Sequence, residues 1–360
     1  MKVCILGNNL TSLALAKALV KKEIFVDLFY EKKNIKPDTS RTIGISKTNI
    51  NYFNKNISNI NGILWPIKKI RIFTENSKNN EIIKFENPND NLFSILSNQK
   101  IFNQLVLELK KNKFFRFKKN TKYKKLIDTG YDLLINCEIR NEITKKFFSK
   151  KFEKKYNSIA FTTIIKHKKL LFNDEARQIF TNDGPIAFLP ISKEKTSIVY
   201  SERNKKNKTD LNIKKVIDKF NPKYDIKKIH RVSKFELKSL NLRDYYKDNI
   251  LAFGDLLHKL HPLAGQGFNM SIRDIKELLK IIDYRIKLGL PIDQGVCVEF
   301  QKNTKSKNFL FSEGINFIYE YFNSNNKIGD NIIDTTARLI GKNKLLNKYF
   351  KTIADIGLQN

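Results

Sequence analysis

The chain has 360 residues, of which 41% are hydrophobic and 11% aromatic, so it can bury a core larger than that of one small domain. It carries 68 basic against 36 acidic residues, and its formal net charge is +32. Because the lysines are scattered and no nucleic-acid-binding motif accompanies them, we expect a charged surface and no nucleic-acid partner. No uncharged apolar run approaches the ~18 residues of a membrane span, so a transmembrane protein is not expected.

The three cysteines indicate a reducing compartment. Cys4, Cys137 and Cys297 lie far apart and form no CxxC pair, so no disulfide framework is expected. No charged leader with a cleavage site precedes the first apolar segment. We therefore expect a cytoplasmic protein, whose contact with the inner membrane would be peripheral.

The first thirty residues predict a strand, a helix and a second strand. Val3 to Leu6 is a short apolar strand, Leu13 to Val20 an apolar helix, and Ile24 to Tyr30 a strand that ends at Glu31. A βαβ unit with an acidic residue after its second strand is typical of dinucleotide-binding folds. The same unit also occurs in domains that bind nothing.

The turn after the first strand has an altered glycine pattern. The usual GxGxxG is replaced by Gly7, Asn9 and Ser12, so only the glycine of the tight turn is kept. Asparagine tolerates positive φ better than most residues, and serine is small enough for close packing of helix on strand. The fold can therefore survive the change.

The middle of the chain predicts strands and one amphipathic helix. A half-buried strand is expected around residues 65–73, a helix over 99–109 with Ile101, Leu105 and Leu109 on one face, and a strand-rich region from 151 to 200. Residues 205–221 are rich in lysine and are expected to be exposed.

Residues 249–274 combine a strand, a glycine-rich loop and a long helix. Ile250 to Phe253 is apolar and stops at Gly254, and a helix is expected from Gly267, with one continuous apolar face. The members of that face are Phe268, Ile272, Ile275, Leu279, Ile282 and Ile286. The uncovered first amides of such a helix suit an anionic or electron-rich ligand, and Asp255 can accept hydrogen bonds from hydroxyls of the same ligand.

This stretch resembles the second flavin fingerprint of FAD-dependent aromatic hydroxylases, and most of all the polyprenyl-phenol hydroxylases of ubiquinone biosynthesis. The matching residues are Gly254, Asp255, His258, His261, Pro262, Leu263, Ala264, Gly265, Gln266, Gly267, Asn269, Arg273 and Asp274. Residues 176–191 resemble a segment of the same family's substrate sheet, and residues 38–46 resemble the segment after its second strand.

The resemblance implies an α/β fold with a Rossmann-like FAD-binding lobe of the para-hydroxybenzoate-hydroxylase type. A mixed β-sheet substrate lobe would be inserted into it, and C-terminal helices would follow. The implied boundaries are 1–75, 95–150 and 246–290 for a discontinuous FAD lobe, 76–94 and 151–245 for the substrate sheet, and 291–360 for helices, with 298–322 and 332–350 helical, that pack on the FAD lobe.

The resemblance also implies which residues would hold FAD. They are Gly7, Asn9, Ser12, Glu31, Arg41, Gln99, Gly254, Asp255, Pro262, Ala264, Gly265, Gln266, Gly267 and Asn269. Pro262 and Ala264 would line the flavin side of the catalytic pocket, and no dedicated acid or base is identified. The family's Asp-Gly pair, which supports FAD and the pyridine nucleotide together, is replaced by Glu138-Ile139, and Ile139 lacks the backbone freedom of glycine.

The implied reaction is hydroxylation of the aromatic ring of a polyprenylated phenol by a flavin hydroperoxide, with dioxygen as co-substrate. NAD(P)H or a separate reductase would supply electrons, and a quinone-biosynthesis complex is a further expected partner. The alternative is a scaffold subunit of such a complex that keeps the fold without turnover. A metal site at His258 and His261 is not expected, because no third ligand of the right type is near and Pro262 follows directly.

Overall fold

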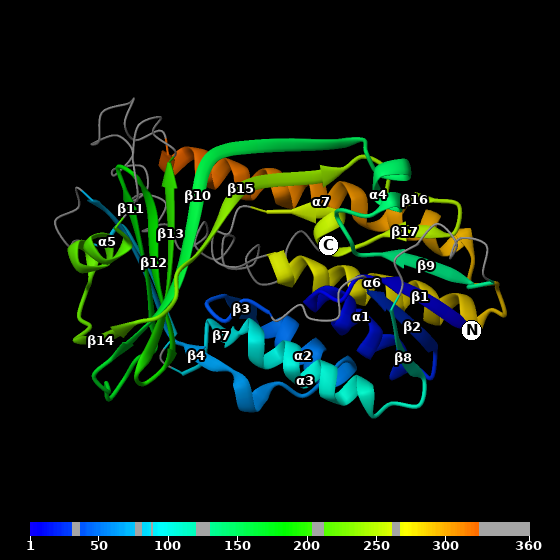
Figure 1. The fold of residues 1–360 in the computed structure, drawn as a ribbon, viewed down its shortest axis with the longest axis horizontal. Coiled ribbons are helices and arrows are strands. Elements are labelled where there is room, and N and C mark those ends of the chain that lie inside the picture. The colour runs from blue at the N-terminus through cyan, green and yellow to red at the C-terminus, as the bar shows by residue number, and fades with distance from the viewer. Residues whose placement is uncertain are drawn as a thin grey trace.

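The computed structural model describes residues 1–30, 37–75, 81–87, 89–119, 130–203, 212–260 and 267–323, which form three sheets and the helices around them (Figure 1). None of the described helices is both long and apolar enough to cross a bilayer. Cys4, Cys137 and Cys297 are all buried and unbonded.

A six-stranded sheet with a parallel centre forms one half of the molecule (Figure 1). Its order is β16 (Tyr246–Lys247), β17 (Ile250–Ala252), β9 (Leu133–Asn136), β1 (Lys2–Leu6), β2 (Phe25–Tyr30) and β8 (Phe115–Lys119). Val3 of β1 is paired with Val26 on one side and with Leu133 on the other. The chain leaves β1 toward β2 and later returns to β9 on the opposite side, so the strand order reverses at β1.

Helices cover both faces of this sheet and enclose the largest apolar core. They are α1 (Leu10–Val20), α2 (Lys47–Asn56), α3 (Asn98–Lys110), α4 (Glu142–Phe147), α6 (Gly267–Lys287) and α7 (Gln294–Asn323). α1 is buried on nearly all sides, as a helix that is apolar all round must be, because it contacts both α3 and α6. The expected helix over residues 99–109 is confirmed as α3, and the expected helix start at Gly267 as α6.

One position of the predicted apolar face, Ile286, is exposed. On α6, Ile272, Ile275, Leu279 and Ile282 are buried as predicted, but Ile286 is 51% exposed because the helix ends one residue later at Lys287. On α7, Phe309 is 43% exposed, while Phe311 packs into the core. The predicted helix at residues 332–350 lies outside the described residues.

A nine-stranded mixed sheet forms the other half of the molecule (Figure 1). Its strands are β18 (His258–Lys259), β15 (Ser233–Leu242), β10 (Lys151–His167), β13 (Lys195–Arg203), β12 (Gly184–Ser192), β11 (Glu175–Thr181), β5 (Lys69–Thr74) and β6 (Ile83–Glu86), with β14 (Ile226–Ile229) paired to β10. β10 and β15 are long and curved, and they run from beside the six-stranded sheet into the nine-stranded one.

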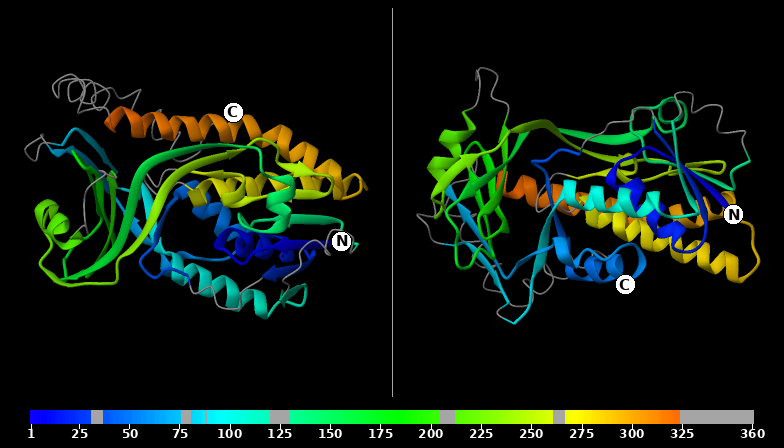
Figure 2. Two further views of the ribbon diagram at one scale, coloured as in Figure 1. Left: turned by 45° about the horizontal axis from the view of Figure 1, so that its top comes forward. Right: turned by 60° about the horizontal axis from the view of Figure 1, so that its bottom comes forward.

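The two large sheets are connected by smaller elements. A three-stranded sheet joins β3 (Thr42–Ser46), β7 (Phe93–Ser97) and β4 (Trp65–Ile67). The helix α5 (Ile213–Phe220) covers one face of the nine-stranded sheet and buries Ile217 against it. Figure 2 shows α7 running along β10 and β15, and α7 contacts β15 to β18. β5 (Lys69–Thr74) lies in the nine-stranded sheet. The resemblance had implied that residues up to 75 belong to the FAD lobe, so the chain enters the nine-stranded sheet earlier than expected.

The buried carboxylate of Asp27 makes the stability of the six-stranded sheet depend on pH. Burial alone would raise the pKa of Asp27, but hydrogen bonds from Lys118 (2.8 Å) and Tyr131 (2.7 Å), and the charges of Lys118 and Lys2, lower it. A carboxyl group with a lowered pKa stabilises the fold above its ordinary pKa, and this contribution is lost as the pH falls. Asp27→Asn should therefore lower the free energy of unfolding by ~1–3 kcal/mol at neutral pH.

Urea titrations of parent and variant at several pH values measure this effect. The difference between the two proteins should shrink as the pH falls below about 4. Asp218→Asn, which changes an exposed carboxylate on α5, is the matched control. A difference that stays constant down to acid pH would show that the charge of Asp27 does not stabilise the sheet.

Candidate functional site

The carboxyl ends of β1, β9 and β17 meet at one edge of the six-stranded sheet, at the strand where its order reverses (Figure 1). Hydrogen bonds hold the three ends in line: the Cys137 amide donates to the Leu6 carbonyl (3.0 Å), and the Phe253 amide donates to the Asn136 carbonyl (2.9 Å). In open α/β sheets, ligands bind in the crevice at such a reversal point. The loops that begin at Gly7, Glu138 and Gly254 therefore border the expected ligand crevice.

Gly7 makes the tight turn at the end of β1. Its φ of +104° is rarely adopted by a residue with a side chain, and a Cβ there would lie 2.9 Å from Cγ of Glu138. Glu138 therefore lies against the Gly7 turn. The neighbouring Ile139 has no positive φ and is 37% exposed, so the backbone of this loop does not require glycine at residue 139.

Asn9 and Ser12 complete the start of α1. The Asn9 side chain is the N-cap: its Oδ1 accepts a hydrogen bond from the Ser12 amide (3.0 Å), and its Nδ2 donates to the Cys137 carbonyl (2.9 Å). Ser12 is fully buried, and its hydroxyl donates to the Asn9 carbonyl (2.9 Å). Asn9 thus joins the loops after β1 and β9, a connection that glycine could not make.

Gly254 brings the end of β17 against α1. Its φ is +64°, and a Cβ there would lie 2.9 Å from Cγ2 of Thr11. The Thr11 hydroxyl is also hydrogen-bonded to the Ser271 hydroxyl of α6 (3.2 Å). The positive φ and the close approach to Thr11 both require glycine at residue 254. Gly254 is therefore needed for the packing of α1, α6 and β17.

Asp255 is exposed beside a group of basic side chains. Burial is the largest cause of the lowered pKa of Lys259, and the charges of Lys238, Arg41 and Arg140 lower it further, whereas the charge of Asp255 acts in the opposite direction. Asp255, Arg41 and Arg140 therefore each lie within electrostatic range of Lys259. A carboxylate that accepts from hydroxyls, next to basic groups, suits a ligand that carries both hydroxyls and phosphates.

Arg41 and Gln99 lie side by side at the start of α3. The Asn98 amide, one residue before Gln99, donates to the Arg41 carbonyl (3.1 Å), and the adjacent strands pair Thr42 with Ser97. The Arg41 guanidinium lies 5.4 Å from the centre of the Phe235 ring on β15. The structure thus brings both predicted residues to the border between the six-stranded and nine-stranded sheets.

Asn269 is fixed at the start of α6 by three hydrogen bonds. Its Oδ1 accepts from the Ser46 amide (3.2 Å) and from Asn49 Nδ2 (3.0 Å), and its Nδ2 donates to the Gly44 carbonyl (2.9 Å). It is 2% exposed. These bonds attach α6 to β3 and α2, and a direct contact of Asn269 with a cofactor stays a prediction.

Part of the predicted site lies outside the described residues, namely Glu31, Pro262, Ala264, Gly265 and Gln266. At Gly267, where α6 begins, none of the residues that the structure describes lies within 4 Å of the position of the missing Cβ. Among the residues that the structure places, no group of three His, Cys, Asp or Glu side chains could hold a metal ion. His258 is buried, and its Nε2 is hydrogen-bonded to Asp274 Oδ2 (2.5 Å). Asn308 Nδ2 donates to Oδ1 of the same carboxylate (3.0 Å).

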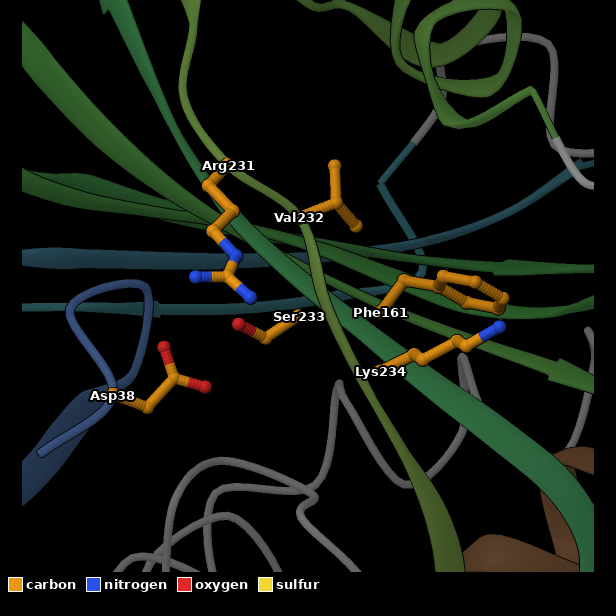
Figure 3. Close-up of a pocket in the computed structure, with 6 residues that line it drawn as sticks. All are labelled: Asp38, Phe161, Arg231, Val232, Ser233 and Lys234. Carbon is orange, nitrogen blue, oxygen red and sulfur yellow. The ribbon is translucent and has the colours of Figure 1, made fainter. Parts of the chain in front are cut away.

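A second cavity, of about 530 Å³, lies between the loop before β3 and the nine-stranded sheet (Figure 3). It is lined by Asp38, Phe161, Arg231, Val232, Ser233 and Lys234. Figure 3 shows the Asp38 carboxylate, the Arg231 guanidinium and the Ser233 hydroxyl pointing toward one another, while Phe161 and Val232 form an apolar part. Burial alone would raise the pKa of Asp38, but hydrogen bonds from Ser40 and Ser233 and the charge of Arg41 lower it, so the carboxylate is a charged acceptor.

Sequence reasoning did not find Lys259, Arg140 or the residues of the second cavity. Lys259 lies inside the second fingerprint, residues 249–274. A basic residue within a predicted ligand-binding stretch could have marked it as a candidate. Asp38 opens the segment 38–46 that resembles the family, but it was not singled out, and Arg231 and Ser233, about 190 residues further along the chain, belong to no motif. Only the pairing of β15 with β10 brings Ser233 opposite Thr162, whose hydroxyl is hydrogen-bonded to that of Ser40 (2.8 Å).

Comparison with known protein families identifies an FAD-binding domain. Residues 148–287 match the family model described as "FAD binding domain". The chain is similar to 3-demethoxyubiquinol 3-hydroxylase of Escherichia coli (strain K12), with 28% identity over 159 residues, which cover 42% of this chain and 41% of that protein. It is also similar to the mitochondrial ubiquinone biosynthesis monooxygenase COQ6 of Schizosaccharomyces pombe, with 24% identity over 34% of this chain and 26% of that protein. The matched segments thus span less than half the length of these curated relatives.

Solved structures share the fold across nearly the whole chain. p-Nitrophenol 4-monooxygenase PnpA from Pseudomonas putida has a TM-score of 0.77 at 11% identity, over 97% of each chain. Klebsiella pneumoniae HpxO, complexed with FAD and uric acid, has a TM-score of 0.76 at 12% identity, over 99% of this chain and 97% of that one. Together, the matches confirm the expected fold class, the resemblance to FAD-dependent aromatic hydroxylases, and FAD as the cofactor of this domain.

Proposed function

We propose that this chain, which carries an FAD-binding domain in the fold of the FAD-dependent monooxygenases, hydroxylates the aromatic ring of a polyprenylated phenol in ubiquinone biosynthesis. The observation that carries the proposal is the meeting of Gly7, Glu138 and Asp255 at the strand ends where the sheet order reverses. The relatives named for ubiquinone biosynthesis support the substrate class.

The residues around the crevice fit FAD. Asp255 would accept hydrogen bonds from the ribityl hydroxyls, and Arg41 and Arg140 would lie near the diphosphate. The tight turn at Gly7 and the N-terminus of α1 would face the same diphosphate. Bound and reduced FAD would supply the activation of dioxygen, and the chain's own task is to bind it, orient the phenol and exclude water.

The cavity lined by Asp38 and Phe161 is the proposed entry for the substrate. Asp38 would accept a hydrogen bond from the phenol hydroxyl, and Phe161 and Val232 would contact apolar parts of the substrate. The predicted boundaries remain a proposal: 1–75, 95–150 and 246–290 for the FAD lobe, 76–94 and 151–245 for the substrate sheet, and 291–360 for helices that pack on the FAD lobe. The exception is β5 (Lys69–Thr74), which lies in the nine-stranded sheet.

A cytoplasmic location is proposed from the three buried, unbonded cysteines. A polyprenylated substrate would require peripheral contact with the inner membrane, and a quinone-biosynthesis complex is the proposed protein partner. The alternative, a scaffold without turnover, is not favoured, since the relatives matched are named as hydroxylases and monooxygenases.

The direct test is purification of the full chain followed by turnover. We expect a yellow protein with a flavin absorption band, which hydroxylates a short-chain polyprenyl phenol when supplied with a reductant and dioxygen, and mass spectrometry would detect the gain of one oxygen atom. Colourless protein that FAD cannot reconstitute would support the scaffold, and flavin-containing protein that transfers no oxygen to any phenol would reject the substrate class.

The loop at Glu138 and Ile139 predicts slow reduction by a free pyridine nucleotide. Ile139 directly follows Glu138, which lies against the Gly7 turn, and it is 37% exposed, so its side chain would obstruct a nicotinamide that approaches the crevice. We expect anaerobic bleaching of the flavin by NADPH to be slow in the parent protein and faster by about tenfold or more in Ile139→Gly.

Because Ile139 has no positive φ, the obstruction would come from side-chain bulk rather than from backbone strain. Ile139→Ala should therefore accelerate bleaching nearly as much as Ile139→Gly. Leu107→Ala, which removes an exposed apolar side chain from α3, is the control. Fast bleaching of the parent protein would show that the Glu138-Ile139 pair does not hinder reduction.

A further inference from the structure

The two most exposed large hydrophobic side chains in the described part of the chain are consecutive. Leu171 is 77% and Phe172 is 74% exposed, and both lie in the loop between β10 and β11. This loop lies at the end of the nine-stranded sheet where β12 turns into β13 and where β14 begins (Figure 1). Adjacent exposed apolar side chains at a loop tip are typical of a surface that contacts a partner or a membrane.

The loop is held in place on both sides of its tip. The Lys168 amide donates to the Asp225 carbonyl (2.9 Å), and the Leu170 amide donates to the Lys193 carbonyl (3.0 Å). On the other side, Asn173 is buried, and its Nδ2 donates to the Ser192 carbonyl (2.7 Å). Hydrogen bonds on both sides therefore hold the backbone of the loop, and they keep Leu171 and Phe172 exposed at its tip.

A row of lysines crosses three adjacent strands beside this loop. Lys166 of β10 is directly opposite Lys195 of β13 and Lys228 of β14, so the three side chains point to one face of the sheet. Partial burial, followed by the charges of these three lysines, lowers the pKa of the neighbouring His230. Within the described ranges, none of the three lysines forms an ion pair with an acidic residue, although like charges in directly opposite positions destabilise a sheet.

More lysines surround the same end of the sheet. Lys168 and Lys169 precede the tip, Lys193 lies in the β12–β13 turn, and Lys227 lies on β14, and all four are exposed. The carboxylates of this region are those of Asp174, Glu194 and Asp225. We call the tip residues Leu171 and Phe172, together with the lysines at 166, 168, 169, 193, 195, 227 and 228, the loop face.

We propose that the loop face is the surface by which this protein docks on an anionic lipid bilayer, with Leu171 and Phe172 inserted among the acyl chains and the lysines on the headgroups. Basic side chains near an anionic bilayer each add about 1 kcal/mol of attraction, which is about fivefold in binding, and inserted apolar area adds to this. The proposal extends the proposed function by naming where an enzyme for a lipid-tailed phenol meets the bilayer. Binding to vesicles needs no turnover, so the two proposals can fail separately.

The test is co-sedimentation of the FAD-containing full chain with vesicles. We expect binding to vesicles of phosphatidylcholine with phosphatidylglycerol, little binding to phosphatidylcholine alone, and weaker binding as salt rises. The triple variant Lys166→Gln, Lys195→Gln, Lys228→Gln should bind about a hundredfold more weakly. It should fold at least as well as the parent, since it removes like charges that face one another.

Matched controls separate this face from the general positive charge of the protein. Lys110→Gln, Lys276→Gln and Lys280→Gln remove the same charge from exposed positions of α3 and α6, and should leave binding within about twofold of the parent. Leu171→Ser with Phe172→Ser should weaken binding about tenfold, whereas Leu107→Ser should not.

Insertion is tested by adding a fluorophore at the tip. In Phe172→Trp, the new indole should be quenched by lipids that carry a quencher near the headgroups, after subtraction of the signal of the parent, whose single tryptophan is Trp65. Absence of vesicle binding, or equal loss in the control lysine variant, would overturn the proposal. Tighter binding to duplex RNA than to vesicles, lost in the triple variant, would assign the loop face to nucleic acid instead.

Discussion

Asp255→Ala is expected to purify without FAD and to need a much higher FAD concentration for reconstitution. The carboxylate is exposed at the end of β17, beside the basic groups of Lys259, Arg41 and Arg140. Removing it would leave ligand hydroxyls without an acceptor, at ~1–3 kcal/mol for each lost contact, which is about five- to 150-fold in the dissociation constant. Flavin absorbance per protein, followed by titration of the apoprotein with FAD, measures the loss.

Two variants show whether the loss is specific to this carboxylate. Asp255→Asn keeps the shape and one acceptor, so it should retain more FAD than Asp255→Ala. Asp244→Ala removes an exposed carboxylate from the connection between β15 and β16, and should retain FAD fully. The thermal transition of each apoprotein should match that of the parent apoprotein. Undiminished flavin content in Asp255→Ala would remove this residue from the site.

Gly184→Ala is expected to give the largest loss of stability among simple substitutions in the nine-stranded sheet. Gly184 starts β12 with a φ of +131°, and a Cβ there would lie 1.8 Å from the carbonyl oxygen of Ser201 on β13. That oxygen is part of a paired backbone and cannot rotate away, so both strands would have to shift. We expect the free energy of unfolding to fall by more than about 4 kcal/mol.

Other glycines of the chain separate the two causes of this loss. Gly289 has a φ of +66° with nothing near its missing Cβ, so Gly289→Ala tests the backbone conformation alone, at about 1–2 kcal/mol. Gly62 has open space and no positive φ, so Gly62→Ala should be neutral within about 0.5 kcal/mol. Urea midpoints should therefore fall in the order Gly62→Ala, Gly289→Ala, Gly184→Ala. Equal midpoints for the last two would show that the clash relaxes at no cost.

The fold and the second fingerprint could be predicted because their signals are local. The apolar run at Ile250, the stop at Gly254 and the periodic face from Phe268 each depend on residues within a few turns of chain, and β17 and α6 follow from them. The same local argument failed at Ile286, because exposure depends on where the neighbouring layer ends, and no local pattern carries that information.

The crevice itself could not be predicted in detail, because its contacts join distant segments. Glu138 lies against Gly7 only because β9 is the neighbour of β1, and the sequence does not state the strand order. Lys259 and Arg140 meet near Asp255 for the same reason. The cavity at Asp38 requires the register that sets Ser233 opposite Thr162, and this register has no signature in either strand.

The side chain of Asn9 also bears on how the turn after β1 is formed. A glycine at residue 9 would leave the Ser12 amide without this acceptor and the Cys137 carbonyl without this donor, whereas Asn9 bonds to both within the protein. The turn after β1 is therefore shaped before any nucleotide enters. Because both hydrogen bonds lie within the protein, this corner needs no nucleotide to complete them, and bound FAD would add to the stability of the fold by mass action.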